Sequence, residues 1–530
     1  MLPRASGVLL HPTSLPSEYG IGDIGIQAIN GKPSPMKRFI DCLDATGQRF
    51  WQVLPLGPTF YSHSPYQSSS TFAGNPNLIS LEDLCTAIDA RPALLRRQEL
   101  DDHPPFRRRI VEFEPVVRWR EEMLDLAFDR FLAYGGEKDG GDFDQFAQAN
   151  ASWLDDYALF MALKEDNQNR PWNLWPRGQA LYADLEIKAA KRKLRVPILK
   201  HKFRQWLFFQ QWQTLKDYAG SKGIEIIGDL PIYVAMDSAD VWRNRNLFDL
   251  NSDGYPNAVA GVPPDYFSAT GQLWGNPLYK WEEHSGTGFA WWIERVKASL
   301  RLVDRVRIDH FRAFYNYWRV PAGELTAQNG KWIENEKESG IGTALFKALQ
   351  AAIPRPLGEV IIAEDLGAKM DDIIQWRVDE LHLPGMEILQ FAFGEDDSER
   401  GRFTPTQEQR RNNILYTGTH DNNTLLGWWC MDAGDRGQAR VKAFAEKWFK
   451  QAWDGSDPHL MLTRIGMESA TNMFILPLQD VLGLGATSRM NTPATDSGNW
   501  RWRCEDDDLN PQSEAWQRVK HLTEHSGRAH

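Results

Sequence analysis

Eight short apolar segments, each running into polar or glycine-rich residues, constrain the fold of this chain more than any other feature. Most are bounded by stretches of helical character, such as residues 342–353 before the fifth segment. Strands that alternate with helices predict a parallel sheet, and eight such units predict a closed (β/α)₈ barrel. The segments are 7–14, 49–58, 224–233, 305–311, 359–367, 386–393, 413–421 and 472–483.

Two long stretches between these segments predict insertions. Residues 81–200 are amphipathic and rich in arginine, and a structureless loop of that length is rare, so we expect a mostly helical inserted subdomain after the second strand. Residues 235–285 are rich in Asn, Asp, Gly, Pro and aromatic residues, which predicts an inserted loop subdomain that covers the mouth after the third strand. Only a short tail follows the eighth segment. We therefore expect a single barrel domain over 1–530 without a separate C-terminal β-domain.

The composition is that of a soluble globular protein, with 42% hydrophobic and 25% charged residues. No apolar run could span a bilayer, and the run GVLL near the N-terminus is too short for a secretory signal, so we expect a cytoplasmic protein. A net charge of −11 argues against nucleic acid and anionic membranes as partners. The 22 tryptophans suit a large core, and they also suit the apolar faces of sugars.

Two other classes of site find little support in the motifs. The four cysteines lie far apart without C-x-x-C spacing, which argues against a zinc site or a redox pair. Residues 20–25, GIGDIG, match a dinucleotide-binding pattern, but that pattern needs a tight turn from a strand into a helix. Prolines Pro12 and Pro16 separate the preceding apolar run from these glycines, and no acidic residue follows at the end of a second strand.

The fourth segment carries charge on one side of a predicted strand. Side chains alternate along a strand, so Arg305, Arg307 and Asp309 share one face, while Val306 and Ile308 occupy the other. If the apolar pair packs on the helices, Arg307 and Asp309 point into the barrel. The guanidinium is then expected to keep Asp309 ionised with a depressed pKa. An ionised carboxylate at the mouth of a barrel is a candidate nucleophile.

Three other strands end in carboxylates, namely Asp229, Glu364, and Asp421 beside His420. Four carboxylates at one mouth cannot all stay ionised, so the least compensated should have a raised pKa and donate a proton. Glu364 follows an apolar run and has no adjacent basic residue, so it is the best candidate. A nucleophilic carboxylate and a general acid about 5 to 5.5 Å apart are what retaining glycosidic cleavage needs.

Structural roles compete with this interpretation. A lone carboxylate at a strand end usually caps a helix or forms an ion pair, Arg307 could be a core ion-pair partner, and His420 could be a hydrogen-bonded core histidine. A metal-dependent barrel enzyme is another alternative, in which Asp229, Asp309 and Glu364 would bind Mg²⁺. The fixed cation of Arg307 beside Asp309 counts against that alternative.

Several motifs together resemble one known family. In chain order they are GVLLHPTSLPSEYGIGDIG (7–25), SPYQSSSTFAGNP (64–76), IIGDLPIYV (226–234), RVRIDHFRAF (305–314), IIAEDLG (361–367) and TGTHDNNT (417–424). Their joint occurrence, over about residues 5 to 503, is similar to the 4-α-glucanotransferases of the amylomaltase or disproportionating type. These belong to glycoside hydrolase family 77, in the α-amylase clan.

The resemblance implies a (β/α)₈ barrel with inserted subdomains and a role for each matching residue. Asp309 matches the nucleophile, Glu364 the general acid and base, and Asp421 the carboxylate that stabilises the transition state. Arg307 matches the arginine that orients the nucleophile, and Tyr66 the ring beneath the −1 sugar. The remaining expected substrate contacts are Asp229, His310, His420 and Asn491 near the donor sugar, and Asp265, Tyr266, Gln272 and Trp274 on the acceptor side.

The implied activity moves a segment of an α-1,4-glucan from a donor maltodextrin to the 4-hydroxyl of an acceptor glucan or glucose. The expected partners are maltooligosaccharides and α-1,4-glucans, with no cofactor and no metal site, in a monomer or a homodimer. Two alternatives stay open at this point, a hydrolase of the α-amylase type with the same carboxylates and a glucan-binding protein without catalysis.

Overall fold

Eight parallel strands form the centre of the computed structural model, in the order β10-β11-β12-β1-β2-β3-β6-β9. The structure describes residues 1–29, 31–87, 92–138, 140–264, 269–394, 403–405, 411–495 and 497–529. The strands are β1 (Ala5–Leu9), β2 (Phe50–Gln52), β3 (Glu225–Pro231), β6 (Arg305–Asp309), β9 (Ile361–Ala363), β10 (Met386–Ile388), β11 (Ile414–Tyr416) and β12 (Met473–Pro477). Seven lie within predicted segments, and β1 begins two residues before the first segment and overlaps it, so the predicted barrel is confirmed.

The barrel is nearly closed, and its seam lies between β9 and β10, the two ends of the hydrogen-bonded order. Ala363 N donates to Pro384 O across this seam at 2.9 Å. Met386 N donates to the carboxylate of Asp365 at 3.1 Å. A side-chain oxygen therefore replaces a backbone acceptor where the ladder is interrupted.

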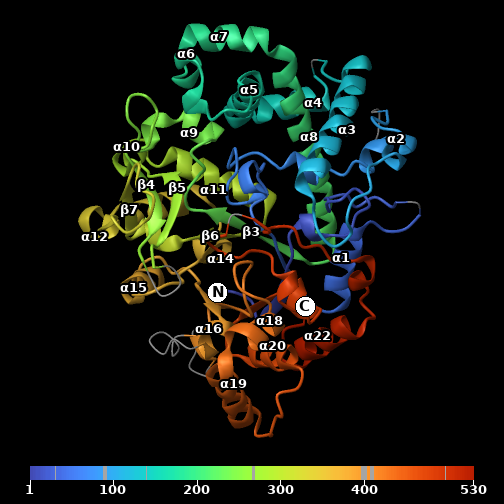
Figure 1. Ribbon diagram of the computed structural model, residues 1–530, viewed down its shortest axis with the longest axis vertical. Coiled ribbons are helices and arrows are strands. Elements are labelled where there is room, and N and C mark those ends of the chain that lie inside the picture. Colours follow the sequence, from blue (N-terminus) through green and yellow to red (C-terminus); the bar gives the residue numbers. More distant parts are fainter. Residues whose placement is uncertain are drawn as a thin grey trace.

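Helices follow or precede most strands and surround the barrel (Figure 1). The apolar residues Ile341, Leu345 and Leu349 recur every four residues in α13 and are buried, as expected for an amphipathic helix against a sheet. The helices around the barrel are α1 (Pro35–Ala45), α8 (Arg195–Ser221), α11 (Ala290–Leu302), α13 (Ile341–Ala352), α14 (Leu357–Val360), α15 (Asp371–Asp379), α16 (Leu389–Phe393), α18 (Leu425–Gly427), α19 (Gly434–Phe449), α20 (Pro458–Glu468), α21 (Leu478–Val481) and α22 (Glu514–His525).

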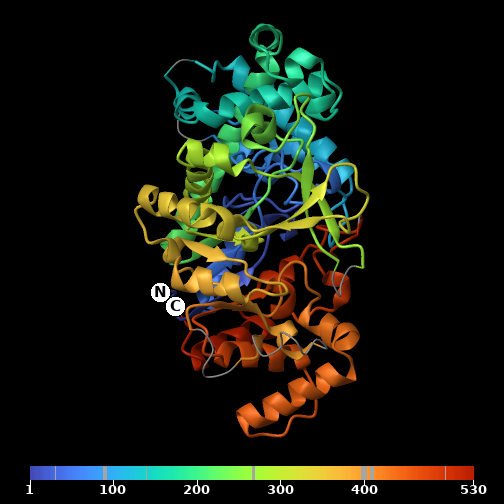
Figure 2. The ribbon, with the colours of Figure 1, turned by 90° about the vertical axis from the view of Figure 1, so that its left-hand side faces the viewer.

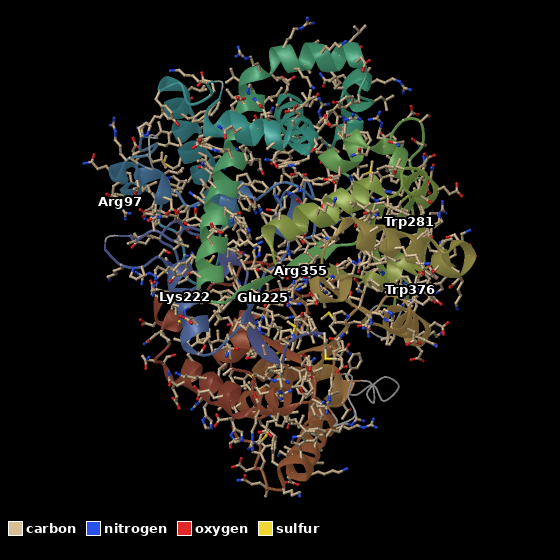
Figure 3. The ribbon with its side chains drawn as sticks, turned by 180° about the vertical axis from the view of Figure 1, so that it is seen from behind. Arg97, Lys222, Glu225, Trp281, Arg355 and Trp376 are labelled. Carbon is tan, nitrogen blue, oxygen red and sulfur yellow. The ribbon has the colours of Figure 1, made fainter. Side chains whose placement is uncertain are left out.

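Most of the chain between β2 and β3, from α2 onward, is helical and lies in the upper part of Figure 1. Its long helix α8 leads back into β3, as Figure 3 shows from behind, where Glu225 marks the start of that strand. The other helices of this stretch are α2 (Arg97–Asp101), α3 (Phe113–Ala133), α4 (Asp142–Ala149), α5 (Ala151–Asp166), α6 (Arg177–Ala180) and α7 (Asp184–Lys193).

A second, antiparallel sheet stands beside the barrel, in the order β5-β4-β7-β8 (Figures 1 and 2). Its hairpin β4 (Ala258–Val262) and β5 (Gln272–Pro277) lies between the short helices α9 (Ala239–Arg243) and α10 (Trp281–Gly286), in the region expected to be loop. The other two strands, β7 (Tyr317–Pro321) and β8 (Lys331–Ile333), follow β6 and precede α12 (Asn335–Ser339). Sequence analysis did not predict this sheet, because glycine, proline and charged residues interrupt its short strands.

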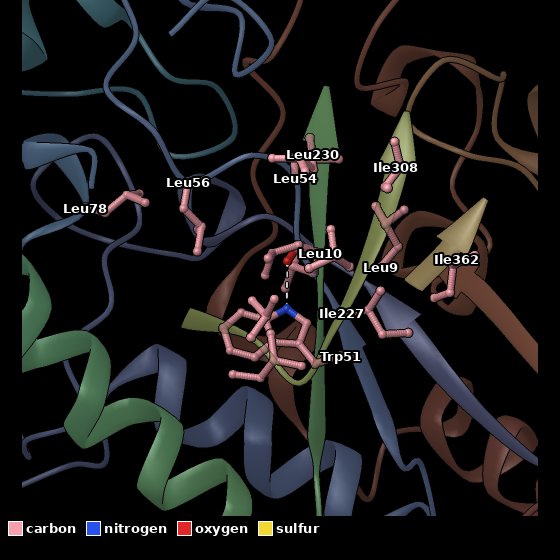
Figure 4. Close-up of a cluster of buried hydrophobic side chains, with 14 of the residues drawn as sticks. Leu9, Leu10, Trp51, Leu54, Leu56, Leu78, Ile227, Leu230, Ile308 and Ile362 are labelled. Carbon is pink, nitrogen blue, oxygen red and sulfur yellow. Dashed lines mark hydrogen bonds between the residues drawn. The ribbon is translucent and has the colours of Figure 1, made fainter. Parts of the chain in front are cut away.

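The outer and inner faces of the barrel sheet have different environments. Trp51 on β2 is fully buried against Phe39 of α1 and Trp212 of α8, and its indole N–H donates to Leu10 O at 2.8 Å (Figure 4). Leu230 of β3 and Ile308 of β6 are register partners and extend this core. The interior of the barrel is instead partly polar. The inward-facing side chains there form the site described next.

No helix among the described residues is both long enough and apolar enough to cross a membrane.

Candidate active site

The charged side chains of β3 and β6 form an ion-paired cluster at the mouth of the barrel. Asp229 and Arg307 lie opposite each other in the parallel register, so both side chains point into the barrel. The Nη1 atom of Arg307 is 2.7 Å from each oxygen of Asp229, and Nη2 is 3.0 Å from Oδ1 of Asp309. Burial alone would lower the pKa of Arg307, but these two carboxylates outweigh it and raise the pKa. The cluster therefore holds one permanent cation between two carboxylates.

The pKa of Asp309 differs from the prediction. Burial raises its pKa to about 6, the charge of Arg307 opposes this shift, and the charge of Asp229 adds to it. The prediction of a depressed pKa was wrong, because burial and the charge of Asp229 outweigh the charge of Arg307, which pairs with both carboxylates. The side chain of Asp309 is 29% exposed at the mouth, so its carboxylate is accessible from solvent.

Glu364, immediately after β9, is held by two backbone N–H groups. Its Oε2 accepts from the N–H of His310 at 2.7 Å, and its Oε1 accepts from that of Leu366 at 2.9 Å. Burial raises the pKa of this carboxyl to about 8, Arg307 opposes the shift, and the negative charge of Asp309 adds to it. The predicted rise in the pKa of Glu364 is confirmed.

A strained backbone conformation aims one of these donors. His310, which follows the candidate nucleophile, has φ 51°, the left-handed region that costs a non-glycine residue on the order of 1 kcal/mol or more. This conformation turns its N–H toward Glu364. The neighbouring backbone is also bonded, since Glu364 N donates to Ile308 O at 3.0 Å. The end of β6 and the end of β9 are therefore joined at the two candidate catalytic carboxylates.

Asp421, after β11, lies in a different environment. Its Oδ1 accepts from Nδ2 of Asn491 at 2.6 Å, and its Oδ2 lies 3.3 Å from Nε2 of His420. The surrounding protein alone would raise the pKa of Asp421, but the charge of His420 and the hydrogen bonds from His420 and Asn491 lower it to about 2. Burial lowers and Asp421 raises the pKa of His420, and the balance is a raised value. Asp421 is thus an ionised carboxylate whose partner is a histidine with a raised pKa.

An aromatic wall joins the two groups of charges. The ring of Tyr66 stacks on that of His420, with centroids 4.9 Å apart, and its hydroxyl donates to Asp229 at 2.7 Å. Trp500 lies against both rings, at 5.8 Å from Tyr66 and 5.7 Å from His420. A flat wall beside a cluster of carboxylates suits the apolar face of a sugar ring.

The small sheet contributes the remaining predicted contacts that the structure describes. Trp274 on β5 meets the imidazole of His310 edge-on, with centroids 4.7 Å apart, and its Nε1 donates to Gln272 Oε1 at 3.2 Å. Burial lowers the pKa of His310 to about 3, so this imidazole is neutral. The predicted contacts Asp265 and Tyr266 lie outside the described residues.

Two residues near the site escaped sequence analysis. Trp500 supports Tyr66 and His420 from a left-handed conformation (φ 64°), and no local pattern indicates that position. Asp480 is buried, and its two oxygens accept from the hydroxyl of Thr417 at 2.6 Å and from Leu425 N at 2.7 Å. It thereby fastens both ends of the turn that carries Asp421. Its place in the eighth apolar segment, three residues after the end of β12, was a usable signal, because the other site carboxylates also lie at or after strand ends.

The metal alternative finds little support in this geometry. Among the described residues no group of three or more His, Cys, Asp or Glu side chains is arranged to hold a metal ion. Between Asp229 and Asp309, where that alternative placed Mg²⁺, lies the guanidinium of Arg307.

A (β/α)₈ barrel whose mouth combines a protonated carboxyl, an arginine-paired carboxylate and an aromatic wall has the groups that enzymes acting on glycosidic bonds use. The family model described as 4-alpha-glucanotransferase matches residues 10–509. The chain belongs to this family, and it is therefore an enzyme of the glycosyl-transferring class.

Individual relatives agree along nearly the whole chain. The 4-alpha-glucanotransferase of Synechocystis is 44% identical over 509 residues, which cover 96% of this chain and 95% of that protein. That of Thermus thermophilus is 42% identical over 513 residues, covering 96% and 97%. Among solved structures, an amylomaltase from Streptococcus agalactiae in complex with acarbose has a TM-score of 0.87 at 34% identity, covering 99% of this chain and all of that one.

Proposed function

We propose that this enzyme transfers segments of α-1,4-glucans by a retaining double displacement through a covalent glycosyl-Asp309 intermediate. The observation that carries the mechanism is the difference between two pKa values, about 6 for Asp309 and about 8 for Glu364. Between these values Asp309 is ionised and Glu364 protonated. This is the pair of states that a nucleophile and a general acid require.

In the first step a carboxylate oxygen of Asp309 attacks the anomeric carbon of the donor glucan. The bond from that carbon to the leaving oxygen breaks, and Glu364 gives its proton to this oxygen, which departs as the 4-hydroxyl of the released fragment. Asp421, ionised beside His420, stabilises the positive charge that develops on the sugar ring. Arg307 keeps Asp309 in place through its contacts with both carboxylates.

In the second step the ionised Glu364 takes the proton from the 4-hydroxyl of an acceptor sugar. The resulting oxygen attacks the anomeric carbon, and the bond to Asp309 breaks, so the carboxylate is regenerated. Transfer in place of hydrolysis requires that the site admit a sugar hydroxyl and exclude water. The hairpin of β4 and β5, with Trp274 next to His310, is the candidate cover on the acceptor side.

The transfer activity is tested with pure maltotriose in the presence of EDTA, with products followed by thin-layer chromatography. Transfer gives glucose together with a ladder of longer maltodextrins, whereas the hydrolytic alternative gives a stoichiometric gain of reducing ends. The ladder should persist in EDTA and be absent in Asp309→Asn and Glu364→Gln. Binding of maltodextrin without any turnover would instead favour the non-catalytic alternative.

The covalent step needs its own test. Fluoride leaves α-maltosyl fluoride without help from a proton donor, so the Glu364→Gln variant should still form the maltosyl intermediate. This variant lacks the base for the second step, so the intermediate should accumulate. Intact-mass spectrometry should then find a maltosyl adduct, which proteolysis places on Asp309. The Asp309→Asn variant is the matched control and should give none. An adduct on another residue would contradict the assignment of Asp309.

A further inference from the structure

The hydroxyl of Tyr233 lies near the barrel mouth without a partner in the protein. Tyr233 is the second residue after β3, the strand that carries Asp229, and it is only 7% exposed. Within the described part of the chain its hydroxyl forms no hydrogen bond. It is not one of the fully enclosed polar atoms that lack a partner, so solvent reaches it. Buried polar groups are nearly always bonded, so a free hydroxyl on an otherwise buried ring points to a group that binds a ligand.

The ring of Tyr233 is fixed by its neighbours. It stacks on Tyr279, with centroids 5.9 Å apart and planes at 19°, and it meets Trp274 at 6.4 Å and 55°. Tyr279 is itself held, because its hydroxyl donates to Ile232 O at 2.6 Å and accepts from Nη1 of Arg295 at 3.1 Å. A side chain fixed in this way loses little conformational entropy when its hydroxyl binds a ligand.

The register of the small sheet places Trp274 and Tyr317 on the same face. Leu273 of β5 and Trp318 of β7 both lie opposite Gly261 of β4, so they share one face of the sheet. Side chains alternate along each strand, so the neighbouring residues Trp274 and Tyr317 share the other face. Because Trp274 contacts Tyr233, this second face is the one that meets the end of β3.

Tyr317 carries a second free hydroxyl close to the first. Its hydroxyl also forms no hydrogen bond with any residue that the structure describes. Burial raises the pKa of Tyr233 well above its ordinary value, and the phenol of Tyr317 adds to this rise, so the two side chains are neighbours. Burial likewise raises the pKa of Tyr317 to about 12. Both phenols therefore stay protonated at neutral pH, and each can donate one hydrogen bond and accept others.

This face of the sheet lies beside the candidate general acid. Trp274 meets the imidazole of His310 edge-on at 4.7 Å, and the N–H of His310 donates to Glu364. In the proposed mechanism Glu364 protonates the leaving oxygen and later deprotonates the acceptor, so both of these occupy its side of the mouth. Tyr233 and Tyr317 therefore lie on the acceptor side.

We propose that the hydroxyls of Tyr233 and Tyr317 bind hydroxyl groups of the acceptor glucan, beside the indole of Trp274. This rests on the proposed function, which places the acceptor next to Glu364. Two uncharged hydroxyls and a flat indole suit a neutral ligand that has many hydroxyls and an apolar ring face. The two tyrosines set the affinity for the acceptor and leave the chemistry at Asp309 unchanged.

The test separates the two steps of the reaction, with α-maltosyl fluoride as donor and maltose as acceptor. Tyr233→Phe and Tyr317→Phe each remove one hydroxyl and keep the ring. Each should raise the KM for maltose about three- to tenfold, the effect of one hydrogen bond, with kcat at saturating maltose unchanged. Release of fluoride in a single turnover without maltose should keep its wild-type rate, because no acceptor takes part in that step.

Tyr182→Phe is the matched control, because it removes a phenol hydroxyl that has a protein partner. Tyr182 follows α6 in the helical insertion, and its hydroxyl donates to Asp156 at 2.6 Å. This variant should lower the melting temperature and leave the KM for maltose unchanged. Tyr233→Phe should instead raise that KM and keep the melting temperature, because the hydroxyl that it removes has no partner in the protein.

The other outcomes are distinguishable. An unchanged KM for maltose in either variant would overturn the proposal for that tyrosine. Slower release of fluoride in the single turnover would overturn it as well, because the phenol would then act on the donor sugar or on the fold. If the wild type releases fluoride but converts the donor only to maltose, transfer is absent and the proposed function itself fails.

Discussion

The two sides of the barrel mouth hold carboxyl groups in opposite ways. On the side of β6 and β9, Glu364 is buried and receives two backbone N–H groups, and the pKa of this carboxyl is about 8. On the side of β11, Asp421 has a 47% exposed side chain, a histidine partner and an asparagine donor, and its pKa is about 2. At Glu364 the charge of Arg307 and two backbone donors do not offset burial beside another carboxylate, whereas His420 and Asn491 offset it at Asp421. The neighbours of each carboxyl, more than its residue type, therefore decide which one donates a proton.

Of the variants that test this comparison, Glu364→Gln should have the largest effect on activity. An amide cannot donate or accept the proton, so we expect kcat for maltotriose to fall on the order of 10²- to 10⁴-fold. In the wild type, activity should rise with pH as Asp309 ionises near 6 and fall as Glu364 deprotonates near 8. The pH profile of kcat/KM checks this. In Glu364→Gln the fall near 8 should disappear, and a remaining fall there would mean that another group is the acid.

Asp421→Asn removes the negative charge from the other side of the mouth. We expect a loss in kcat on the order of 10²- to 10³-fold, because a fixed charge no longer stabilises the transition state. The pKa of His420, which Asp421 raises, should fall, and NMR titration of the histidines measures this fall. Activity within tenfold of the wild type would show that Asp421 contributes little to the transition state.

Asn491→Ala removes a hydrogen-bond donor to Asp421 without changing the charge on this side of the mouth. The variant removes the 2.6 Å hydrogen bond to Asp421, so the pKa of that carboxyl should rise from about 2 toward its ordinary value. A hydrogen bond to a charged group contributes about 1.5 kcal/mol or more, so we expect roughly a tenfold loss in kcat. Steady-state kinetics with maltotriose measures it. An unchanged kcat would indicate that His420 alone holds Asp421.

Thr417→Val should have the smallest effect on activity. It deletes the 2.6 Å bond to the buried Asp480 while keeping the shape of the side chain. We expect the free energy of unfolding to fall by on the order of 1 kcal/mol, with kcat within a few-fold of the wild type. Denaturant titration measures the stability. Thr463→Val is the control, since this buried hydroxyl bonds only the backbone of its own helix. A large loss of kcat would show that this tie, and not packing alone, positions Asp421.

The sequence allowed the barrel and the placement of its charges to be predicted, because both depend on local patterns. Alternation alone placed Arg307 and Asp309 inside the barrel and Val306 outside, and the register of β3 then brings Asp229 to the same guanidinium. The pKa of Asp309 could not be predicted, since it depends on burial and on Asp229, a second carboxylate that reaches the same guanidinium from another strand. The small sheet was missed because β7 and β8 come from a different part of the chain than β4 and β5. Trp500 shares this limitation, as its neighbours Tyr66 and His420 are distant in sequence.

The left-handed turn at His310 has a consequence for how the site tolerates motion. Glu364 directly follows β9, the strand beside the barrel seam, where the sheet has no continuous ladder to β10. Its carboxyl is nevertheless gripped by the N–H of the residue covalently joined to Asp309. If the seam opens, Asp309 and Glu364 should therefore move together. The bonds between the ends of β6 and β9 would then preserve the spacing of the two carboxyl groups that the proposed double displacement needs.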